Sequence, residues 1–368
     1  MNKNIFKNMD YGILICTIIL LCVGLIALYS ATQSNSGSEF KKQVIWICVS
    51  IPIMIAIIFV DYENIAKLSP ILYGVTIIAL IAVLFTRARS DATSWFTIGK
   101  VYIQPSEFAK IVVTFFLAYY IARVQEQGKN QISRPTRVLT ALAIAGLPVF
   151  LIILQPDYGT ALAFIVATIL MLFVSGIKKR YIIAGILLIV ILVPVLYMFV
   201  LPDHAKSRID VFLNPNLDPR GAGYNVIQSK LAIGSGEFLG MGLLKGNQTQ
   251  LGFLYPKTTD FIFAVIGEEL GFVTAAAVII AYVILITRII YIAKTAKNTL
   301  GSCIAIGICG IFMFHMIENI GMTMGILPIT GVPLPFVSYG GSFLLTNYIS
   351  IGLLLNISGR REKNMFIS

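Results

Sequence analysis

Charged residues are scarce in this sequence: Asp, Glu, Lys and Arg make up only 12% of its 368 residues. Soluble domains carry about a quarter of their residues as these four types, so the composition excludes an ordinary soluble fold. Apolar residues take their place, because 57% of the chain is hydrophobic and the mean hydropathy is +0.87. The composition therefore predicts an integral membrane protein.

Cysteine and histidine are also few. The cysteines all lie inside apolar runs without metal-ligand spacing, so they are interpreted as small packing residues. His204 and His315 each stand alone in the sequence and are interpreted as structural. Neither residue type predicts a metal site or an organic cofactor. The cysteines are Cys16, Cys22, Cys48, Cys303 and Cys309.

Acidic residues are outnumbered: 17 Asp and Glu stand against 28 Lys and Arg, which gives a net charge of +11. In a soluble chain this excess would suggest a nucleic-acid partner. Here the basic residues cluster in short loops between apolar runs, which is the positive-inside pattern of membrane proteins. The charge distribution therefore predicts a membrane, and no nucleic acid, as partner.

Long apolar runs make up most of the chain. Runs of roughly 17–25 residues can cross a bilayer, and the sequence offers ten candidates. The first run, which Asp10 opens, lacks a convincing cleavage site and is interpreted as a retained helix. The candidate spans cover residues 11–30, 44–60, 70–85, 107–122, 138–154, 160–176, 181–201, 261–290, 303–324 and 341–357.

The basic loops orient these spans. With ten spans, the basic loops after spans four, six, eight and ten lie on the same side as the basic N-terminus, the cytoplasmic one. Only the loop before span four, with Arg87, Arg89 and Lys100, is notably basic outside. We predict an all-α, polytopic, single-domain membrane protein (residues 1–368) with ten transmembrane helices and both termini cytoplasmic. A large extracellular loop, residues 202–259, joins helices seven and eight.

Asp260 stands where this loop enters span eight, in the sequence Thr259-Asp260-Phe261. A carboxylate at the edge of the hydrocarbon layer is costly unless it is solvated or paired. One interpretation is a helix cap, because Asp at a helix N-terminus accepts hydrogen bonds from free amides. The other is catalysis, and the local sequence leaves both open.

The outer loop also carries a glycine-rich stretch over residues 234–248. Glycines let backbone amides approach an anion closely, and Arg208 and Lys245 would add positive charge for a phosphate. The alternative is a set of ordinary turns between amphipathic helices on the membrane surface. The spacing favours neither alternative.

Charged residues recur at the outer ends of other spans. Glu107 and Lys110 are i,i+3 neighbours at the start of span four, either a neutralised pair or a lysine aimed at a lipid-linked phosphate. Asp157 is predicted to cap span six. Glu268 and Glu269, deeper in span eight, need hydrogen-bonding partners or water, for proton transfer or for packing around a polar interior.

The last outer segment, residues 327–342, contains three prolines with flanking glycines, which forbid a regular helix. Irregular backbone at membrane depth is tolerated where it is buried in protein or lines a cavity. We therefore predict a re-entrant or cavity-lining loop, with Ser338 as a candidate substrate ligand.

At these residues the chain resembles the SEDS family (shape, elongation, division and sporulation proteins) of bacterial cell-wall synthesis. The resemblance covers nearly the whole chain, and residues 247–253 resemble the elongation branch more than the division branch. One departure is Tyr255-Pro256-Lys257-Thr258, where many members have Pro-Glu and a His before Thr-Asp. The matching segments are residues 104–110, 155–160, 218–229, 259–271 and 331–342.

The resemblance implies a peptidoglycan glycosyltransferase that polymerises lipid II on the outer face of the bacterial cytoplasmic membrane, together with a class B penicillin-binding protein, a transpeptidase. Asp260 matches the family's catalytic aspartate, a general base that deprotonates the acceptor sugar's 4-hydroxyl. Either a divalent cation, Mg²⁺ or Mn²⁺, or basic side chains such as Lys110 and Arg208 would stabilise the leaving pyrophosphate. Residues expected around the same substrate are Glu107, Asp157, Lys245 and Ser338.

Two other functions compete with this one. A flippase for the lipid-linked precursor needs polar access from both leaflets, whereas the irregular polar segments here gather on the outer side. A scaffold that only recruits a transpeptidase would explain the spans but leave Asp260 and the glycine-rich loop without a role. The asymmetry favours chemistry at the outer face.

Overall fold

The computed structural model describes residues 4–33, 37–86, 94–99, 101–128, 131–199, 203–214, 217–218 and 221–361. Arg87, Arg89, Lys100 and the side chain of His204 lie outside the described part. Each of the ten predicted apolar runs coincides with one long helix. These helices are α2 (Tyr11–Thr32), α3 (Ser38–Phe59), α4 (Tyr62–Val83), α5 (Pro105–Glu126), α6 (Pro135–Ile153), α7 (Tyr158–Val174), α8 (Lys179–Phe199), α12 (Ile262–Thr295), α13 (Thr299–Thr323) and α14 (Gly341–Gly359).

Shorter elements join these helices. Over the described residues the all-α prediction is confirmed except for one antiparallel hairpin, β1 (Phe96–Ile98) with β2 (Val101–Ile103), which the periodicity of the sequence did not indicate. The large loop before α12 is itself largely helical. The short helices are α1 (Asn4–Asn8), η2 (Gln131–Ser133), α9 (Asp203–Leu213), α10 (Ala222–Ser235) and α11 (Asn247–Gln250).

Side-chain caps fix where several long helices begin. Asp10 at α2, Asp61 at α4, Asp157 at α7 and Asn298 at α13 each accept a hydrogen bond from a backbone amide of the first turn. Such caps satisfy amides that have no partner within the helix. The predicted capping by Asp157 is confirmed, with Thr160 N donating to its Oδ1 over 3.2 Å.

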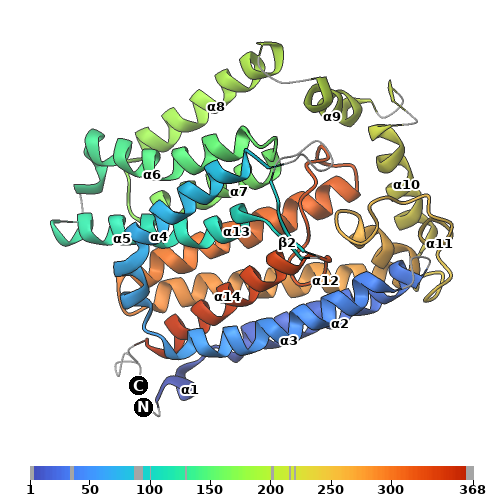
Figure 1. Ribbon diagram of the computed structural model, residues 1–368, viewed down its shortest axis with the longest axis horizontal. Coiled ribbons are helices and arrows are strands. Elements are labelled where there is room, and N and C mark those ends of the chain that lie inside the picture. The colour runs from blue at the N-terminus through green and yellow to red at the C-terminus, as the bar shows by residue number, and fades with distance from the viewer. Residues whose placement is uncertain are drawn as a thin grey trace.

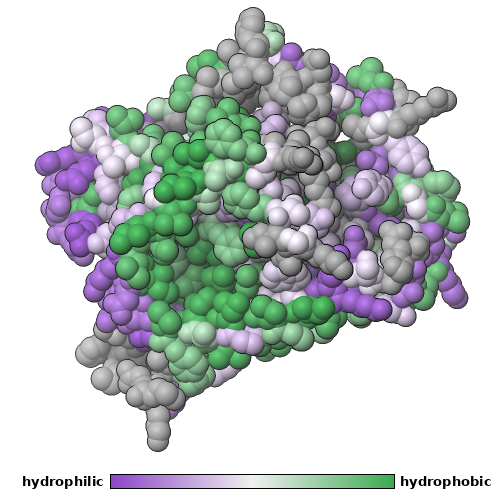
Figure 2. Space-filling view, in the orientation of Figure 1, coloured by the Kyte–Doolittle hydropathy of each residue, from purple (hydrophilic) through white to green (hydrophobic). Residues whose placement is uncertain are grey.

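The chain is a multi-pass membrane protein, and within its described residues seven helices are long and apolar enough to cross a bilayer by length and composition. They are α2, α3, α4, α6, α12, α13 and α14, and α7 is apolar but shorter. Figure 2 shows apolar residues over the middle of the molecule and hydrophilic ones at its two ends.

The helices stack in layers, with α12, α13 and α14 between α4–α7 on one side and α2 and α3 on the other (Figure 1). Most of α13 and α14 is buried by this packing. The central helices therefore carry polar side chains that would be unfavourable against lipid, and these side chains hold the loops described next.

Candidate functional site

Four segments that are far apart in the sequence meet around Asp260. The first turn of α7 touches the loop before α14, because a Cβ on Gly159 would meet Val332 and Thr330. The same loop before α14, residues 330–340, is bonded to the segment before α12, where Tyr339 N donates to Thr258 O over 2.9 Å. The start of α5 joins them through the side chains described below. The structure thus brings together the outer segments that the sequence singled out.

The loop 330–340 is irregular and largely buried in protein, as predicted for its prolines. Two side chains of α13, one turn apart, hold it. His315 Nδ1 lies 2.9 Å from Pro333 O, and Asn319 Nδ2 donates to Val332 O over 2.7 Å. Asn319 also donates to Asp260 O over 2.9 Å, so one amide group fixes both segments.

Asp260 does not cap α12. Phe261 is the N-cap residue and provides no side-chain cap, so the capping interpretation of Asp260 is wrong. Its carboxylate is half-buried, and burial raises its pKa from 3.8 to about 6. A hydrogen bond from Thr259 and the positive charge of Arg208 oppose this shift without cancelling it. The geometry therefore leaves a carboxylate that can exchange a proton near neutral pH.

Arg208 reaches this site from α9. Its Nη1 lies 3.5 Å from Ile329 O, next to the loop 330–340, and its charge acts on Asp260. The guanidinium is half-buried and retains further donors. Arg208 and Asp260 therefore lie close enough to interact electrostatically.

Glu107 and Lys110 form a buried ion pair on α5. Lys110 Nζ lies 2.9 Å from Glu107 Oε1 and 3.0 Å from His315 Nε2, and both charged side chains are only 3% exposed. An ammonium can only donate and a carbonyl can only accept, so His315 accepts at Nε2 and donates from Nδ1 to Pro333 O. Lys110 thus supports the loop 330–340 through His315.

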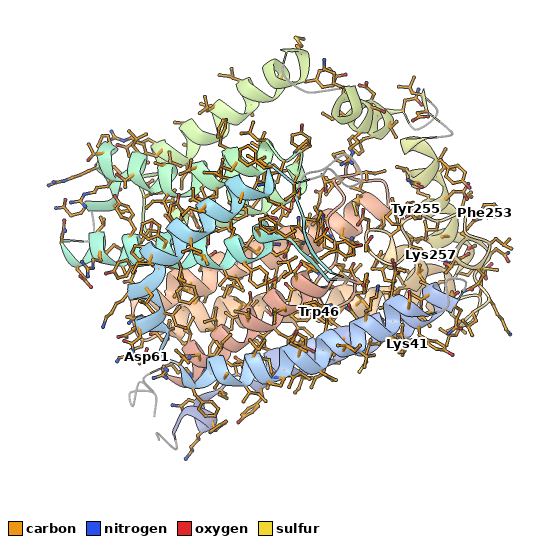
Figure 3. All side chains as sticks on the ribbon, in the orientation of Figure 1. Lys41, Trp46, Asp61, Phe253, Tyr255 and Lys257 are labelled. Atoms are coloured by element: carbon orange, nitrogen blue, oxygen red, sulfur yellow. The ribbon has the colours of Figure 1, made fainter. Side chains whose placement is uncertain are left out.

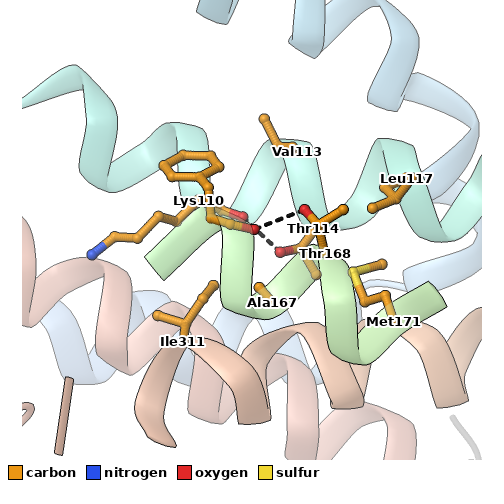
Figure 4. Close-up of a pocket in the computed structure, with 9 residues that line it drawn as sticks. Lys110, Val113, Thr114, Leu117, Ala167, Thr168, Met171 and Ile311 are labelled. Atoms are coloured by element: carbon orange, nitrogen blue, oxygen red, sulfur yellow. Dashed lines mark hydrogen bonds between the residues drawn. The ribbon is translucent and has the colours of Figure 1, made fainter. Parts of the chain in front are cut away.

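A small cavity of about 10 Å³ lies beside Lys110, barely enough for one water molecule. Figure 4 shows its lining by α5, α7 and α13, with the Lys110 ammonium at the opposite end from Met171. The hydroxyls of Thr114 and Thr168 donate to carbonyls within their own helices, so the cavity wall keeps little polar character.

Asp157 lies close to this group. Besides its cap, it accepts a 2.8 Å hydrogen bond from Gln104 Nε2. Burial raises its pKa, and the nearby Lys110 charge is among the interactions that lower it again. The half-buried carboxyl therefore links the turn before α7 to the start of α5.

The remaining predicted site residues lie in two different settings. Ser338 is buried, and its hydroxyl donates to Thr259 O over 2.6 Å and accepts from Leu334 N over 2.8 Å. It therefore holds the residue before Asp260. Lys245 is exposed on the glycine-rich loop. This loop contacts α12 about 10 Å along the helix axis from the first residue of that helix.

The sequence indicates only a structural role for His315 and singles out no role for Asn319, yet these two side chains hold the loop 330–340 and the Asp260 carbonyl. Their spacing of four residues places them on one face of α13, and that periodic pair was the available signal. The contacts that they make could not be read from the sequence, because the partners are carbonyl groups of an irregular loop.

Comparisons with known proteins agree on one family. The profile of the FtsW, RodA and SpoVE group, described as cell cycle proteins, matches residues 11–363. The peptidoglycan glycosyltransferase MrdB of Escherichia coli K12 is 36% identical over 98% of this chain and 97% of its own length. Stage V sporulation protein E of Bacillus subtilis is 34% identical over 95% of this chain and 96% of its own length.

Solved structures show the same fold. A chain of a peptidoglycan synthase complex, studied for the coordination of polymerization and crosslinking, superposes with a TM-score of 0.83 at 25% identity. The match covers 97% of this chain and 99% of that one. Thermus thermophilus RodA, a rod shape determining protein, superposes with a TM-score of 0.72 at 24% identity over 97% of this chain and 98% of its own.

Proposed function

The chain belongs to the cell cycle protein family of FtsW, RodA and SpoVE, and from that premise we propose that it polymerises lipid II with Asp260 as general base. It is a peptidoglycan glycosyltransferase of the SEDS family, similar to MrdB and RodA. The observation that carries the proposal is the half-buried Asp260 carboxylate beside Arg208. Burial raises the pKa of this carboxylate to about 6.

In the proposed reaction the 4-hydroxyl oxygen of the acceptor sugar attacks the anomeric carbon of the donor. The new oxygen–carbon bond forms as the bond to the undecaprenyl pyrophosphate breaks, and Asp260 takes the hydroxyl proton. Arg208 stabilises the negative charge that develops on the pyrophosphate. Lys110 and Glu107 support the site from α5 through His315, and Asp157 and Ser338 fix its backbone.

We place this chemistry at the outer face of a ten-helix membrane domain in the bacterial cytoplasmic membrane. Helix α1 packs against α14 at one end of the molecule, the end at which Asp61 lies (Figures 1 and 3). Lys257 and Tyr255 lie at the other end (Figure 3). With the basic loops cytoplasmic, the end near Lys257 is extracellular.

The described residues do not fit a resident metal centre, because no three His, Cys, Asp or Glu side chains gather among them. A divalent cation, Mg²⁺ or Mn²⁺, would arrive with the pyrophosphate, since such ions take most of their ligands from phosphate and water. It would supply positive charge at the leaving group, in addition to Arg208.

The partner that we propose is a class B penicillin-binding protein, a transpeptidase that crosslinks the new glycan. The similarity to a chain of a peptidoglycan synthase complex supports this assembly. We assign the chain to cell elongation and shape, because MrdB and RodA are among its relatives.

The test is glycan polymerisation from fluorescent lipid II by the purified protein with its partner in detergent. Asp260→Asn should lower the rate by at least about a hundredfold, the typical contribution of general base catalysis. The control Glu237→Gln changes an exposed acid and should leave the rate unchanged. Detergent micelles contain no second leaflet, so polymer formed there also excludes a flippase as the sole activity. Polymer formation by Asp260→Asn at the wild-type rate would remove Asp260 from the catalytic role.

A further inference from the structure

Helix α12 is interrupted near its start, and the outer loop enters the interruption. Gly271 has φ 78° and ψ 179°, which breaks the helix between residues 262–270 and 272–295. The glycine-rich loop pairs with the opened backbone: Met241 N donates to Glu268 O over 2.9 Å, and Phe272 N donates to Glu237 O over 2.9 Å. The loop is therefore bonded to α12 on both sides of the break.

Glycine is required where the two backbones touch. Gly240 has φ 83°, and a Cβ there would clash with the Glu269 carbonyl. A Cβ on Gly271 would clash with Gly240 N, and one on Gly246 would lie 2.6 Å from Glu268 Oε2. These glycines serve close approach between loop and helix, a role that neither interpretation of the glycine-rich stretch from the sequence included.

The side chains of Glu268 and Glu269 complete this contact. Glu268 accepts hydrogen bonds from Gln248 N (2.7 Å), Thr249 N (3.0 Å) and Thr249 Oγ1 (2.6 Å). Glu269 accepts from three further donors of the same loop. These are Leu244 N (3.3 Å), Gly246 N (3.4 Å) and Gln250 Nε2 (2.8 Å).

Both carboxylates are almost completely buried, at 0% and 1% exposure. Buried carboxylates are stabilised when amide and hydroxyl donors surround them. The acids on α12 therefore bind loop residues 244–250 as an anion binds to a nest of amides. We call this set of contacts the carboxylate clamp.

The clamp is connected to Asp260 by one buried lysine. Lys257 Nζ donates to Thr249 O over 2.7 Å. Thr249, whose amide and hydroxyl donate to Glu268, therefore also binds Lys257, which lies three positions before Asp260. On the other side of that segment, Ser338 Oγ donates to Thr259 O. The backbone that carries Asp260 is thus held from the clamp and from the loop 330–340.

We propose that Glu268 and Glu269 are positioning residues for glycosyl transfer, acting through Thr249 and Lys257 on the backbone of Asp260. They do not transfer protons, because their oxygens are occupied by loop donors. The inference rests on the proposed function for its rate measurement, but the clamp itself can be measured without any activity. Loss of the clamp misplaces Asp260 while the substrate's binding contacts elsewhere persist.

The first test is the polymerisation rate of Glu268→Gln, with Thr249→Val and Thr249→Ser as milder variants. In Glu268→Gln an NH₂ group replaces one carboxylate oxygen and faces either Gln248 N or the two donors of Thr249, so the clamp loses at least one hydrogen bond. We expect kcat to fall on the order of ten- to a hundredfold, as for a misplaced catalytic group, with KM changed by less than about threefold. Thr249→Val should fall in the same direction, and Thr249→Ser, which keeps the hydroxyl, should restore the rate.

The second test is additivity. Glu268 and Thr249 share one contact, so the double variant Glu268→Gln, Thr249→Val should be no more than about threefold slower than Glu268→Gln alone. The control Glu237→Gln changes only the exposed side chain of a residue that contacts α12 through its backbone carbonyl, and it should retain wild-type kcat and KM. The positioning role would be overturned if the rate loss of the double variant equalled the product of the two single losses. A raised KM with an unchanged kcat would overturn it as well.

The third test needs no substrate. Lys245 is exposed within the clamped loop, so trypsin cleavage after it reports local opening. Cleavage should be at least about tenfold faster in Glu268→Gln than in wild type or Glu237→Gln. Cleavage at the wild-type rate would refute the clamp. Inactivity of the wild-type protein on lipid II would instead refute the proposed function and leave this measurement standing.

Discussion

Two acidic regions, one just before α12 and one within it, have opposite environments. Glu268 and Glu269 are fully surrounded by donors of one loop. Asp260, at the entrance to the same helix, has a hydrogen bond from Thr259 and the charge of Arg208, and burial still raises its pKa to about 6. Hydrogen bonds therefore compensate the charges of Glu268 and Glu269 fully, whereas the charge of Asp260 is compensated only in part.

The difference separates structural from chemical carboxylates. A carboxylate whose two oxygens both accept hydrogen bonds stabilises the fold, and that stabilisation is lost when the residue is replaced. Its oxygens are not available to accept a proton from a substrate. An acid that is desolvated without full compensation holds its proton more strongly and can act as a base near neutral pH. Removing the two kinds of acid should therefore change stability in opposite directions.

The largest effect is expected for Glu269→Ala. This change leaves the amides of Leu244 and Gly246 and the side chain of Gln250 without their acceptor. Unsatisfied buried donors cost about 1–3 kcal/mol each, partly relieved by entering water, so we expect a loss of about 2–4 kcal/mol. Thermal unfolding in detergent measures it, with Glu237→Gln as the exposed control. A melting temperature equal to wild type would show that the clamp does not stabilise the fold.

Gly271→Ala tests the backbone side of the same region. At φ 78° and ψ 179° a side chain is strained, and the new Cβ would meet the loop at Gly240. The expected loss is about 1–3 kcal/mol. Gly146→Ala is the matched control, because a Cβ there meets nothing within 4 Å in helix α6. Equal melting temperatures for the two variants would contradict the assignment of Gly271 to a required break.

The long helices and the grouping of outer segments could be predicted from sequence, because apolar runs and positive-inside charge are local signals. The break at Gly271 could not, because glycine is compatible with a continuous helix and only the contact with Gly240 requires the φ of 78°. The partners of Glu268 were equally hidden, since they are amides about 20 residues earlier in the chain. Nearly every residue type has a backbone amide, so the sequence does not reveal which amides of a loop bind a given side chain.

A smaller effect of opposite sign is expected for Asp260→Asn. The folded-state pKa of about 6 lies above the ordinary 3.8, so folding weakens as pH rises between these values and the full cost is present above about 6. The neutral amide removes that cost. At pH 8 we expect stabilisation on the order of 1 kcal/mol, which should vanish near pH 4. A destabilised variant at pH 8 would mean that the Asp260 charge is compensated like that of Glu268.

The smallest effect concerns the pH dependence of the rate. A general base must be ionised, so polymerisation should rise with pH through about 6, the pKa of Asp260. The Arg208 charge lowers that pKa, so Arg208→Gln should move the acid limb upward by a fraction of a pH unit, and Arg208→Lys should largely keep it in place. Rate profiles measured at saturating lipid II separate this movement from weaker substrate binding. An acid limb that stays fixed in Arg208→Gln would show that the two groups do not interact, and the contrast between Asp260 and the clamped acids would then rest on burial alone.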